Sequence, residues 1–219
     1  MADTKRATAV LISGRGSNLA ALIAAAKDVR YPARIALVAS DNPAAPGLAI
    51  ARDAGIATAA IDRGALPTKA AFEAKLDAAL REAGTDLVCL TGFMLLLSEK
   101  FVAAWQDKIL NIHPSLLPLF PGLDTHRRAL AAGVRVHGAT VHFVRADVDS
   151  GPIVAQAAVP VLPHDTEEAL AARVLKVEHR LFPLALKLVA GGRARIVEER
   201  VVIEGEKVAP DATLFSPSD

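Results

Sequence analysis

The sequence predicts an α/β fold with a single Rossmann-like domain, in which helices flank a mostly parallel, twisted sheet. Short apolar runs alternate with helical patterns through the first half of the chain, an order typical of consecutive βαβ units. These runs are continuous rather than alternating with polar residues, as expected of parallel strands buried on both faces. The chain has 219 residues and no internal linker that would separate two domains, so we expect one domain over residues 1–219.

The first half of the chain supplies four expected strands and three expected helices. The strands are the apolar runs at residues 7–13, 34–40, 57–61 and 86–91. The helices lie between them, at residues 17–27, 46–54 and 68–83. Gly55 and Gly84 directly follow the last two helices, at the position where glycine commonly ends a helix.

The pattern changes after residue 105, which divides the expected domain into an N-terminal half, 1–105, and a C-terminal half, 106–205. A strand at 108–112 runs into a loop rich in proline and leucine, and a short helix follows at 125–132. Two further strands are expected at 136–144 and 153–162.

The last long helix is expected to open at Asp165, with Glu168 three residues later as a variant capping box. Its apolar residues recur at steps of four and three, which is typical of one buried helix face. They are Leu170, Val174, Val177, Leu181, Leu184 and Leu188. Two short strands are expected after this helix, and the tail at 206–219 is expected to fray.

Composition excludes several classes of function. The chain has 25 Lys and Arg against 24 Asp and Glu, so its net charge of +1 supplies no field that would attract nucleic acid. A single cysteine, Cys89, excludes an internal disulfide, and no apolar run approaches the roughly 18 residues of a membrane span. His137 and His142 lie five residues apart on one strand, so they face opposite sides and cannot share a metal ion. We expect a cytoplasmic protein acting on small molecules without a metal.

A glycine-rich loop joins the first strand to the first helix, with the sequence Ser13-Gly14-Arg15-Gly16-Ser17-Asn18-Leu19. Glycines allow a tight turn, and the free N–H groups of a helix N-terminus suit a phosphate. Leu19 occupies the third glycine position of a dinucleotide fingerprint, although Asp41 could serve as its ribose-binding acid. Two alternatives to a phosphate-binding loop therefore remain: a dinucleotide-binding module, and a helix start that Ser17 simply caps.

Asn111 and His113 are two residues apart at the end of an expected strand, so both side chains face one side. Parallel α/β sheets place their sites at this edge. An amide can donate to an oxyanion, and an imidazole can donate or carry a proton. Asp149, in a later turn, could raise the pKa of this imidazole. The simpler alternatives are a buried histidine satisfied by backbone and an aspartate that only shapes its turn.

The segment Gly92-Phe93-Met94-Leu95-Leu96-Leu97 is apolar but follows the fourth strand, at the edge where sites are expected. It could line a pocket for a flat heteroaromatic ligand. Packing in the core is the alternative.

These segments resemble the phosphoribosylglycinamide formyltransferases, folate-dependent enzymes of purine synthesis in the formyltransferase family. The resemblance runs from about residue 7 to residue 190 and is most specific in Asn111-Ile112-His113-Pro114-Ser115 with the spaced Asp149. The other matching segments are Ile12 to Leu19, Gly92 to Met94, Leu116 to Pro118, Pro121-Gly122, Thr125 to Arg127, and His137 to Val144. The resemblance implies the formyltransferase fold. It also implies transfer of a formyl group from 10-formyltetrahydrofolate, the co-substrate, to the amine of glycinamide ribonucleotide.

The resemblance further implies roles for particular residues. Asn111, His113 and Asp149 match a catalytic trio, in which Asn111 and protonated His113 stabilise the oxyanion and Asp149 raises the pKa of His113. The residues that match ribonucleotide-binding ones are Gly16, Ser17, Asn18 and Leu19 at the phosphate, and Leu175, Lys176, Val177 and Glu178, with Glu178 facing the amine. The residues that match folate-binding ones are Lys69, Met94, Leu95, Leu96, Leu97, Asn111, Arg145, Ala146, Asp147, Val148 and Asp149.

Three positions depart from the family's pattern. Leu95 stands where a basic residue is frequent, Lys69 where an arginine often lies, and Ala146 where an acidic residue is common. Methionyl-tRNA formyltransferase and formyltetrahydrofolate hydrolase are similar to the same core, but each carries an additional domain. These two activities are alternatives to transfer of the formyl group to glycinamide ribonucleotide. A non-catalytic nucleotide-binding module is an alternative outside this family. The expected assembly is a monomer or a homodimer.

Overall fold

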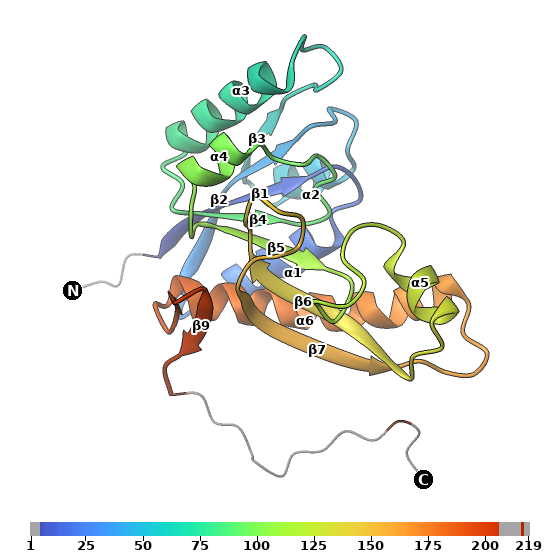
Figure 1. Cartoon of the computed structure of the whole chain (residues 1–219). Helices are drawn as coiled ribbons and strands as arrows, with labels where there is room; N and C mark the ends of the chain where they lie inside the picture. Colours follow the sequence, from blue (N-terminus) through green and yellow to red (C-terminus); the bar gives the residue numbers. More distant parts are fainter. Residues whose placement is uncertain (1–4, 206–215, 217–219) are drawn as a thin grey trace.

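The structure, a computed structural model, describes residues 5–205 and residue 216. Seven strands form its main sheet: β1 (Arg6–Ile12), β2 (Ala33–Ser40), β3 (Ala57–Ala60), β4 (Leu87–Leu90), β5 (Ile109–His113), β6 (Val136–Phe143) and β7 (Ile153–Pro160). Their order across the sheet is β3-β2-β1-β4-β5-β6-β7 (Figure 1). Each of them lies close to the bounds that the apolar runs predicted.

The first five strands are parallel, and β6 and β7 join the sheet in the antiparallel sense. The predicted α/β fold with a mostly parallel sheet is therefore confirmed. β1 lies between β2 and β4, so the strand order reverses direction at this point. Such a reversal opens a crevice at the carboxyl ends of the two diverging strands, where open α/β sheets bind their ligands.

Six helices lie among the described residues: α1 (Ser17–Ala26), α2 (Gly47–Asp53), α3 (Lys69–Glu82), α4 (Glu99–Ala104), α5 (Thr125–Ala131) and α6 (Glu167–Ala190). The sequence predicted all of them except α4. This helix has six residues, which is too short to show a helical hydrophobic period. Its N-cap is Ser98, whose hydroxyl accepts a hydrogen bond from Phe101 N at 3.2 Å.

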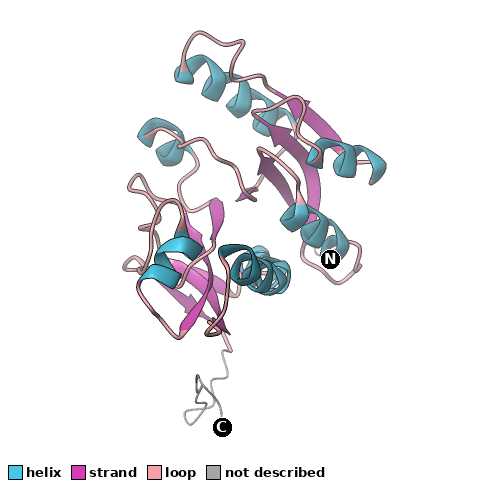
Figure 2. Cartoon of the chain, turned by 90° about the vertical axis from the view of Figure 1, so that its right-hand side faces the viewer, coloured by secondary structure: helices cyan, strands magenta, loops and turns pink. Residues whose placement is uncertain are grey.

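Different helices cover the two faces of the sheet, as Figure 2 shows. In β1, Val10 and Ile12 pack into one apolar cluster with α1, α2 and α6, whereas Ala9 and Leu11 pack into a second cluster with α3 and α4. Successive side chains of a strand point to opposite faces. A continuous apolar run in a central strand therefore contributes to both halves of the core.

The longest helix, α6, begins after the predicted residue. Its N-cap is Thr166, whose hydroxyl accepts from Ala169 N at 3.2 Å. The prediction that Asp165 caps this helix is wrong, because Asp165 instead pairs with Arg173 at 2.6 Å.

The predicted apolar stripe of α6 is buried at Leu170, Val174, Leu181 and Leu188, but Leu184 is 50% exposed. Leu184 lies two heptads after Leu170. An α-helix drifts by about 20° per seven residues relative to its starting face. The heptad spacing therefore carries Leu184 off the buried face, although the step from its neighbours looks regular.

After α6 the chain forms the two expected short strands, β8 (Ala194–Val197) and β9 (Arg200–Ile203), and the structure pairs them as an antiparallel hairpin. The predicted fraying of residues 206–219 concerns positions that, apart from Ser216, lie outside the described residues. Over the described ranges, no helix has the length and apolar character needed to cross a membrane.

One sheet runs through the N-terminal and C-terminal halves of the sequence, because β4 pairs with β5.

Candidate active site

The loops that follow β1, β4 and β5 meet at one edge of the sheet, beside the crevice between β1 and β4. A hydrogen bond from Met94 N to Ser13 Oγ, 2.9 Å long, ties the loop after β4 to the loop after β1. Asn111 and His113 lie at the same edge because β5 pairs in parallel with β4. The structure thus brings together three segments that the sequence placed at strand ends.

The glycine loop leads into the start of α1. Gly16 is the N-cap, in a left-handed conformation with φ 75°. The first hydrogen bond within the helix runs from Ala20 N to Gly16 O at 2.9 Å, so the N–H groups of Ser17, Asn18 and Leu19 precede the helical ladder. Ser17 is the first helical residue, so the alternative in which Ser17 only caps the helix is wrong. Leu19 is fully buried, which leaves only its backbone to meet a ligand.

A second glycine, Gly47 at the start of α2, keeps this loop compact, and the sequence analysis missed it. A Cβ on Gly16 would lie 2.8 Å from the Cα of Gly47, and a Cβ on Gly47 would lie 2.5 Å from Ile12 Cδ1. Gly47 N also donates to Gly14 O at 3.1 Å. A lone glycine at a helix start does not reveal such a close approach, because it also occurs in ordinary helix starts.

Asn18 connects the start of α1 to α6. Its Nδ2 donates to Glu178 Oε2 at 2.7 Å, and both side chains are buried. Burial raises the pKa of the Glu178 carboxyl above its usual value, and the hydrogen bond from Asn18 opposes this rise. Glu178 therefore reaches the glycine loop across 160 residues of sequence. Its neighbours Leu175, Lys176 and Val177 are less buried.

Asn111, His113 and Asp149 come together, although Asp149 follows Asn111 by 38 residues. Asp149 Oδ2 lies 3.2 Å from His113 Nδ1, and Asp149 Oδ1 lies 3.5 Å from Asn111 Nδ2. Asp149 has a left-handed backbone with φ 53°, and its Oδ2 also accepts from Gly122 N at 2.8 Å. The other ring nitrogen of His113, Nε2, lies 2.9 Å from the Phe120 carbonyl oxygen.

Burial dominates the pKa shift of His113, which is only 6% exposed. Burial lowers the pKa of the imidazole below its usual value, although the Phe120 carbonyl and the Asp149 charge raise it. The expectation of a raised pKa is therefore wrong for the net shift, because lost hydration outweighs the nearby anion. Burial also raises the pKa of Asp149, but hydrogen bonds from His142 and Gly122 lower it by more. Asp149 is consequently an anion.

His142 belongs to this cluster, and the sequence analysis missed it. It is 2% exposed and lies opposite Asn111 in the pairing of β5 with β6. Its Nδ1 faces the Phe143 carbonyl at 2.9 Å and must carry the hydrogen. Its Nε2 lies 3.2 Å from Asn111 Nδ2. The same Nε2 lies 3.6 Å from Asp149 Oδ1. The spacing of residues along β6 could not predict that His142 lies beside Asn111, because the register between β5 and β6 decides which residues are neighbours.

A cavity of about 290 Å³ opens at the carboxyl end of β4. Its lining residues are Arg63, Lys69, Phe72, Glu73, Met94, Leu95, Leu96 and Leu97. Met94 and Leu96 are 64% and 67% exposed, whereas Leu95 and Leu97 pack against the core. The segment therefore both lines the cavity and, through Leu95 and Leu97, packs against the core. Its binding of a flat heteroaromatic ligand stays a prediction. Arg63 adds a second cation beside Lys69, and the sequence analysis missed it because a lone loop arginine carries no pattern.

Glu73 holds the wall of this cavity in place. Its carboxylate accepts from Ser98 N at 2.6 Å and from Ser98 Oγ at 2.5 Å. Because Ser98 also caps α4, the pair connects α3, α4 and the apolar segment before Ser98.

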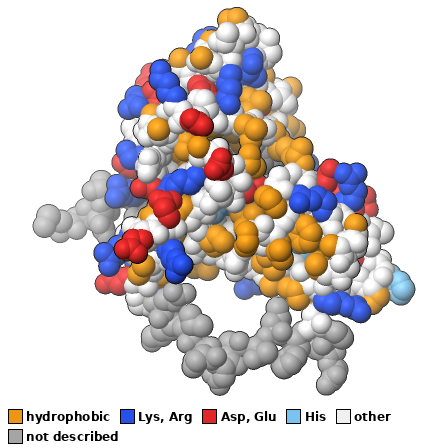
Figure 3. All heavy atoms as spheres, viewed as in Figure 1, with side chains coloured by type: hydrophobic (Ala, Val, Ile, Leu, Met, Phe, Trp, Pro, Cys, Tyr) orange, Lys and Arg blue, Asp and Glu red, His pale blue; other side chains and the backbone are white. Residues whose placement is uncertain are grey.

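The segment from Arg145 to Asp149 ends on the trio, and Ala146, Asp147 and Val148 within it are exposed. Hydrophobic side chains gather on this face of the molecule, as Figure 3 shows. The large exposed ones from the loops around the site are Met94, Leu96, Leu119, Leu123 and Val148. Exposed apolar surface is typical of binding sites for ligands or partners.

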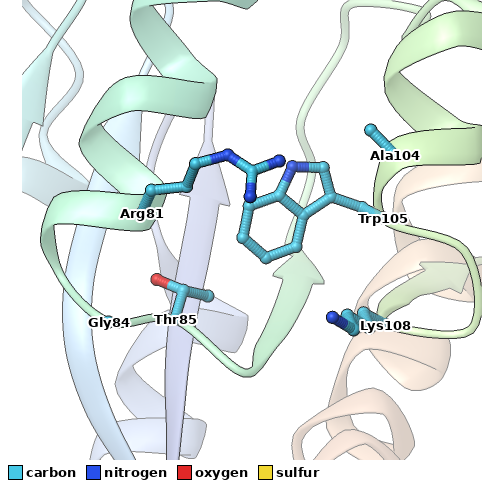
Figure 4. A pocket seen from close by; sticks show the side chains of 6 residues that line it. All are labelled: Arg81, Gly84, Thr85, Ala104, Trp105 and Lys108. Atoms are coloured by element: carbon cyan, nitrogen blue, oxygen red, sulfur yellow. The ribbon is translucent and has the colours of Figure 1, made fainter.

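A second cavity, of about 310 Å³, lies at the opposite ends of β4 and β5. Figure 4 shows the Trp105 indole there with Arg81 and Lys108, whose charged groups lie 5.5 and 5.9 Å from the ring centre. Trp105 Nε1 and Arg81 Nε both donate to Asp77, each at 2.8 Å. These contacts close the core beneath α3 and α4, so we assign this cavity a structural role. Within the described part of the chain, no cluster of three or more His, Cys, Asp or Glu side chains could hold a metal ion.

The sequence model of the formyl transferase family matches residues 6–186. The chain belongs to the formyl transferase family. The match extends from β1 into α6, so it includes the glycine loop and the trio of Asn111, His113 and Asp149. The hairpin β8–β9 lies beyond it.

Curated relatives include proteins of two sizes. The chain is 42% identical over 201 residues to phosphoribosylglycinamide formyltransferase of Escherichia coli (strain K12), and the alignment covers 92% of the chain and 95% of that protein. It is 50% identical over 194 residues to trifunctional purine biosynthetic protein adenosine-3 of Bos taurus. That alignment covers 89% of the chain, which spans 19% of the length of the trifunctional protein.

Solved structures show the same fold. Glycinamide ribonucleotide transformylase 1 from Symbiobacterium toebii is 49% identical with a TM-score of 0.89, and 93% of this chain and 96% of that chain are covered. Formyltetrahydrofolate deformylase from Burkholderia mallei is 29% identical with a TM-score of 0.84, and 92% of this chain and 71% of that chain are covered.

Proposed function

We propose that this chain transfers the formyl group of 10-formyltetrahydrofolate to the amine of glycinamide ribonucleotide, a step of purine synthesis. The observation that carries the proposal is the place of Asn111, His113 and Asp149. They lie at the sheet edge that also holds a phosphate-suited helix start and an apolar cavity. The names of the E. coli and S. toebii proteins agree with this activity.

The ribonucleotide would be held by its phosphate at the start of α1. The N–H groups of Ser17, Asn18 and Leu19 precede the helical ladder, and the positive end of the helix dipole adds to their attraction for an anion. Glu178, held by Asn18, is the carboxylate available near the amine.

The folate would occupy the cavity at the end of β4. The exposed faces of Met94 and Leu96 suit its flat rings, and Lys69 and Arg63 suit the carboxylates of its tail. Backbone groups of Met94 to Leu97 and of Arg145 to Asp149 would bind the polar edge of the pterin. Because these contacts would be to the backbone, the departures from the family's pattern at Leu95 and Ala146 would leave them in place.

In the reaction, the unprotonated amine attacks the formyl carbon, and the new C–N bond leaves the formyl oxygen as an oxyanion. Asn111 Nδ2 and the His113 imidazolium donate to this oxyanion, and the anionic Asp149 stabilises the imidazolium. Collapse of the tetrahedral intermediate breaks its bond to N10 of the folate. The attacking nitrogen loses one proton, and N10 gains one.

The free protein holds His113 in an arrangement that the substrates must change. Both ring nitrogens face acceptors, since Nδ1 lies 3.2 Å from Asp149 and Nε2 lies 2.9 Å from the Phe120 carbonyl. For His113 to donate to the oxyanion, the oxyanion must replace the Phe120 carbonyl at Nε2. Phe120 has φ 54°, an unfavourable conformation for a bulky residue, so we expect its loop to move when substrates bind.

The test follows 10-formyltetrahydrofolate by absorbance, with and without glycinamide ribonucleotide, and identifies the product by mass spectrometry. We expect loss of the formyl folate only with the ribonucleotide present, together with a formylated ribonucleotide. Equal loss without the ribonucleotide, with release of formate, would contradict the proposal.

Formyl folate hydrolysis is the second candidate, because the structurally similar deformylase from Burkholderia mallei is named for the same class of folate. Hydrolysis needs water as its only second reactant. The helix start with the buried Asn18–Glu178 pair favours transfer, because it supplies a site for a second, phosphorylated substrate.

A cytoplasmic location and a monomeric or dimeric assembly stay predictions.

A further inference from the structure

The hairpin β8–β9 reaches back from the end of α6 toward the loop that carries Asp149. In Figure 1 it lies beside the left-hand end of α6, and it lies outside the residues that match the family. Its two-residue turn consists of Glu198 and Glu199, with φ values of 48° and 56°. Turns of this kind favour Asn and Gly, because both central residues are left-handed. Two glutamates at this turn therefore indicate a use for a carboxylate there.

Glu199 uses its carboxylate to hold Arg145 in a bidentate ion pair. Arg145 Nε donates to Oε2 at 2.8 Å, and Nη2 donates to Oε1 at 3.1 Å. Asp107, which precedes β5, pairs with the same guanidinium at 2.8 Å, and the Val144 carbonyl accepts from Nη1 at 3.2 Å. The Arg145 side chain is 18% exposed, against 65% for Glu199. Two acids thus cover a mostly buried guanidinium.

Arg145 begins the segment that ends on Asp149. The base of this loop is closed by a hydrogen bond from Phe143 N to Pro152 O at 2.9 Å. A Cβ on Gly151 would lie 1.8 Å from Phe143 O and 3.2 Å from Arg145 Cγ, so the backbone and Arg145 pack without free space. A movement of Arg145 would therefore be transmitted to the left-handed Asp149.

We propose that the hairpin β8–β9 is a positioning element of the active site: Glu199 and Asp107 hold Arg145 and, through it, the segment that carries Asp149. Its activity readout rests on the proposed formyl transfer. An isolated ion pair at the surface contributes little. This pair is bidentate, shared between two carboxylates and mostly buried at the guanidinium, an arrangement that fixes geometry as well as charge. Glu199 and Asp107 act through Arg145 and are positioning residues.

The first test replaces the carboxylate at the turn and keeps its size. Glu199→Gln is compared with Glu198→Gln, which makes the same change in the same turn but not at a partner of Arg145. We expect the KM for formyl folate to rise about fivefold in Glu199→Gln, equivalent to roughly 1 kcal/mol, with the KM for the ribonucleotide unchanged. Glu199→Arg places a like charge against Arg145 and should raise the KM for folate further. An unchanged KM for folate in Glu199→Arg would overturn the proposal.

The second test needs no turnover. The pKa of His113, measured by NMR titration, is sensitive to its distance from the Asp149 charge, which is one of the groups that raise it. We therefore expect a lower pKa of His113 in Glu199→Gln and Glu199→Arg, but not in Glu198→Gln. A lower melting temperature with unchanged KM for folate and unchanged pKa of His113 would make the ion pair purely structural and would refute the proposal. Wild-type protein that transfers no formyl group would instead count against the proposed function, because the titration remains measurable.

Discussion

The start of α1 and the end of β5 build their parts of the candidate site from different groups. At α1 the groups that suit a ligand are backbone N–H groups, and the conformation of Gly16 sets their position. At β5 they are the side chains of Asn111 and His113, which are bonded to Asp149 and His142. Backbone donors keep their hydrogens at any working pH, whereas the side-chain cluster changes charge with pH.

The difference teaches that the two regions should fail in different ways. A changed side chain at α1 leaves the N–H donors in place, while a changed backbone conformation displaces them. A changed side chain at β5 removes the reacting group or shifts the pKa of its neighbour. Four substitutions test this contrast.

The largest expected effect is that of His113→Ala. Turnover should fall about a hundredfold or more, the usual size of an acid–base contribution, with little change in the affinity for either substrate. Steady-state kinetics and direct binding measure the two quantities. His164→Ala, which changes an exposed histidine, is the control and should be nearly silent. Near-normal turnover in His113→Ala would remove His113 from the mechanism.

Asp149→Asn should come next, with turnover reduced on the order of 10–100-fold. Burial already lowers the pKa of His113, and the Asp149 charge is one of the groups that oppose this shift. Without that charge the pKa falls further, so less imidazolium remains at each pH and the alkaline limb of activity moves to lower pH. Asparagine tolerates the left-handed backbone of this position, so the turn should persist. An unchanged pKa of His113 by NMR would leave Asp149 as a turn residue only.

Gly16→Ala should weaken ribonucleotide binding about fivefold to tenfold and leave folate binding intact. Its φ of 75° disfavours alanine, and the new Cβ would lie 2.8 Å from Gly47 Cα. Gly14→Ala is the matched control, because a Cβ there meets nothing within 4 Å. Calorimetric titration with each substrate checks the expectation, and equal effects of the two substitutions would show that loop geometry does not set the site.

Ser17→Ala should have the smallest effect, with ribonucleotide affinity within about twofold of wild type, because the N–H group of residue 17 remains. The same titration measures it. A tenfold loss would show that the Ser17 hydroxyl, and not the backbone, binds the phosphate, and the contrast between the two regions would disappear.

Local sequence signals predicted the fold and the places of the site segments. The continuous apolar run of β1 predicted a strand buried on both faces, and the two-residue spacing of Asn111 and His113 predicted that they share a side. Both are properties of near neighbours, so the chain sets them without tertiary information. The local signals failed where they were short or marginal, as in the six-residue α4 and at the start of α6.

The sequence by itself determined which groups are available: the glycine loop, the Asn-Ile-His spacing and an aspartate in a turn. Only the tertiary structure decided which of them meet. The register of β5 with β6 places His142 against Asn111, and the packing of α6 on α1 brings Glu178 to Asn18. Burial, rather than the nearest charge, sets the direction in which the pKa of His113 shifts. Register and burial depend on contacts between distant parts of the chain, and spacing along the sequence constrains neither.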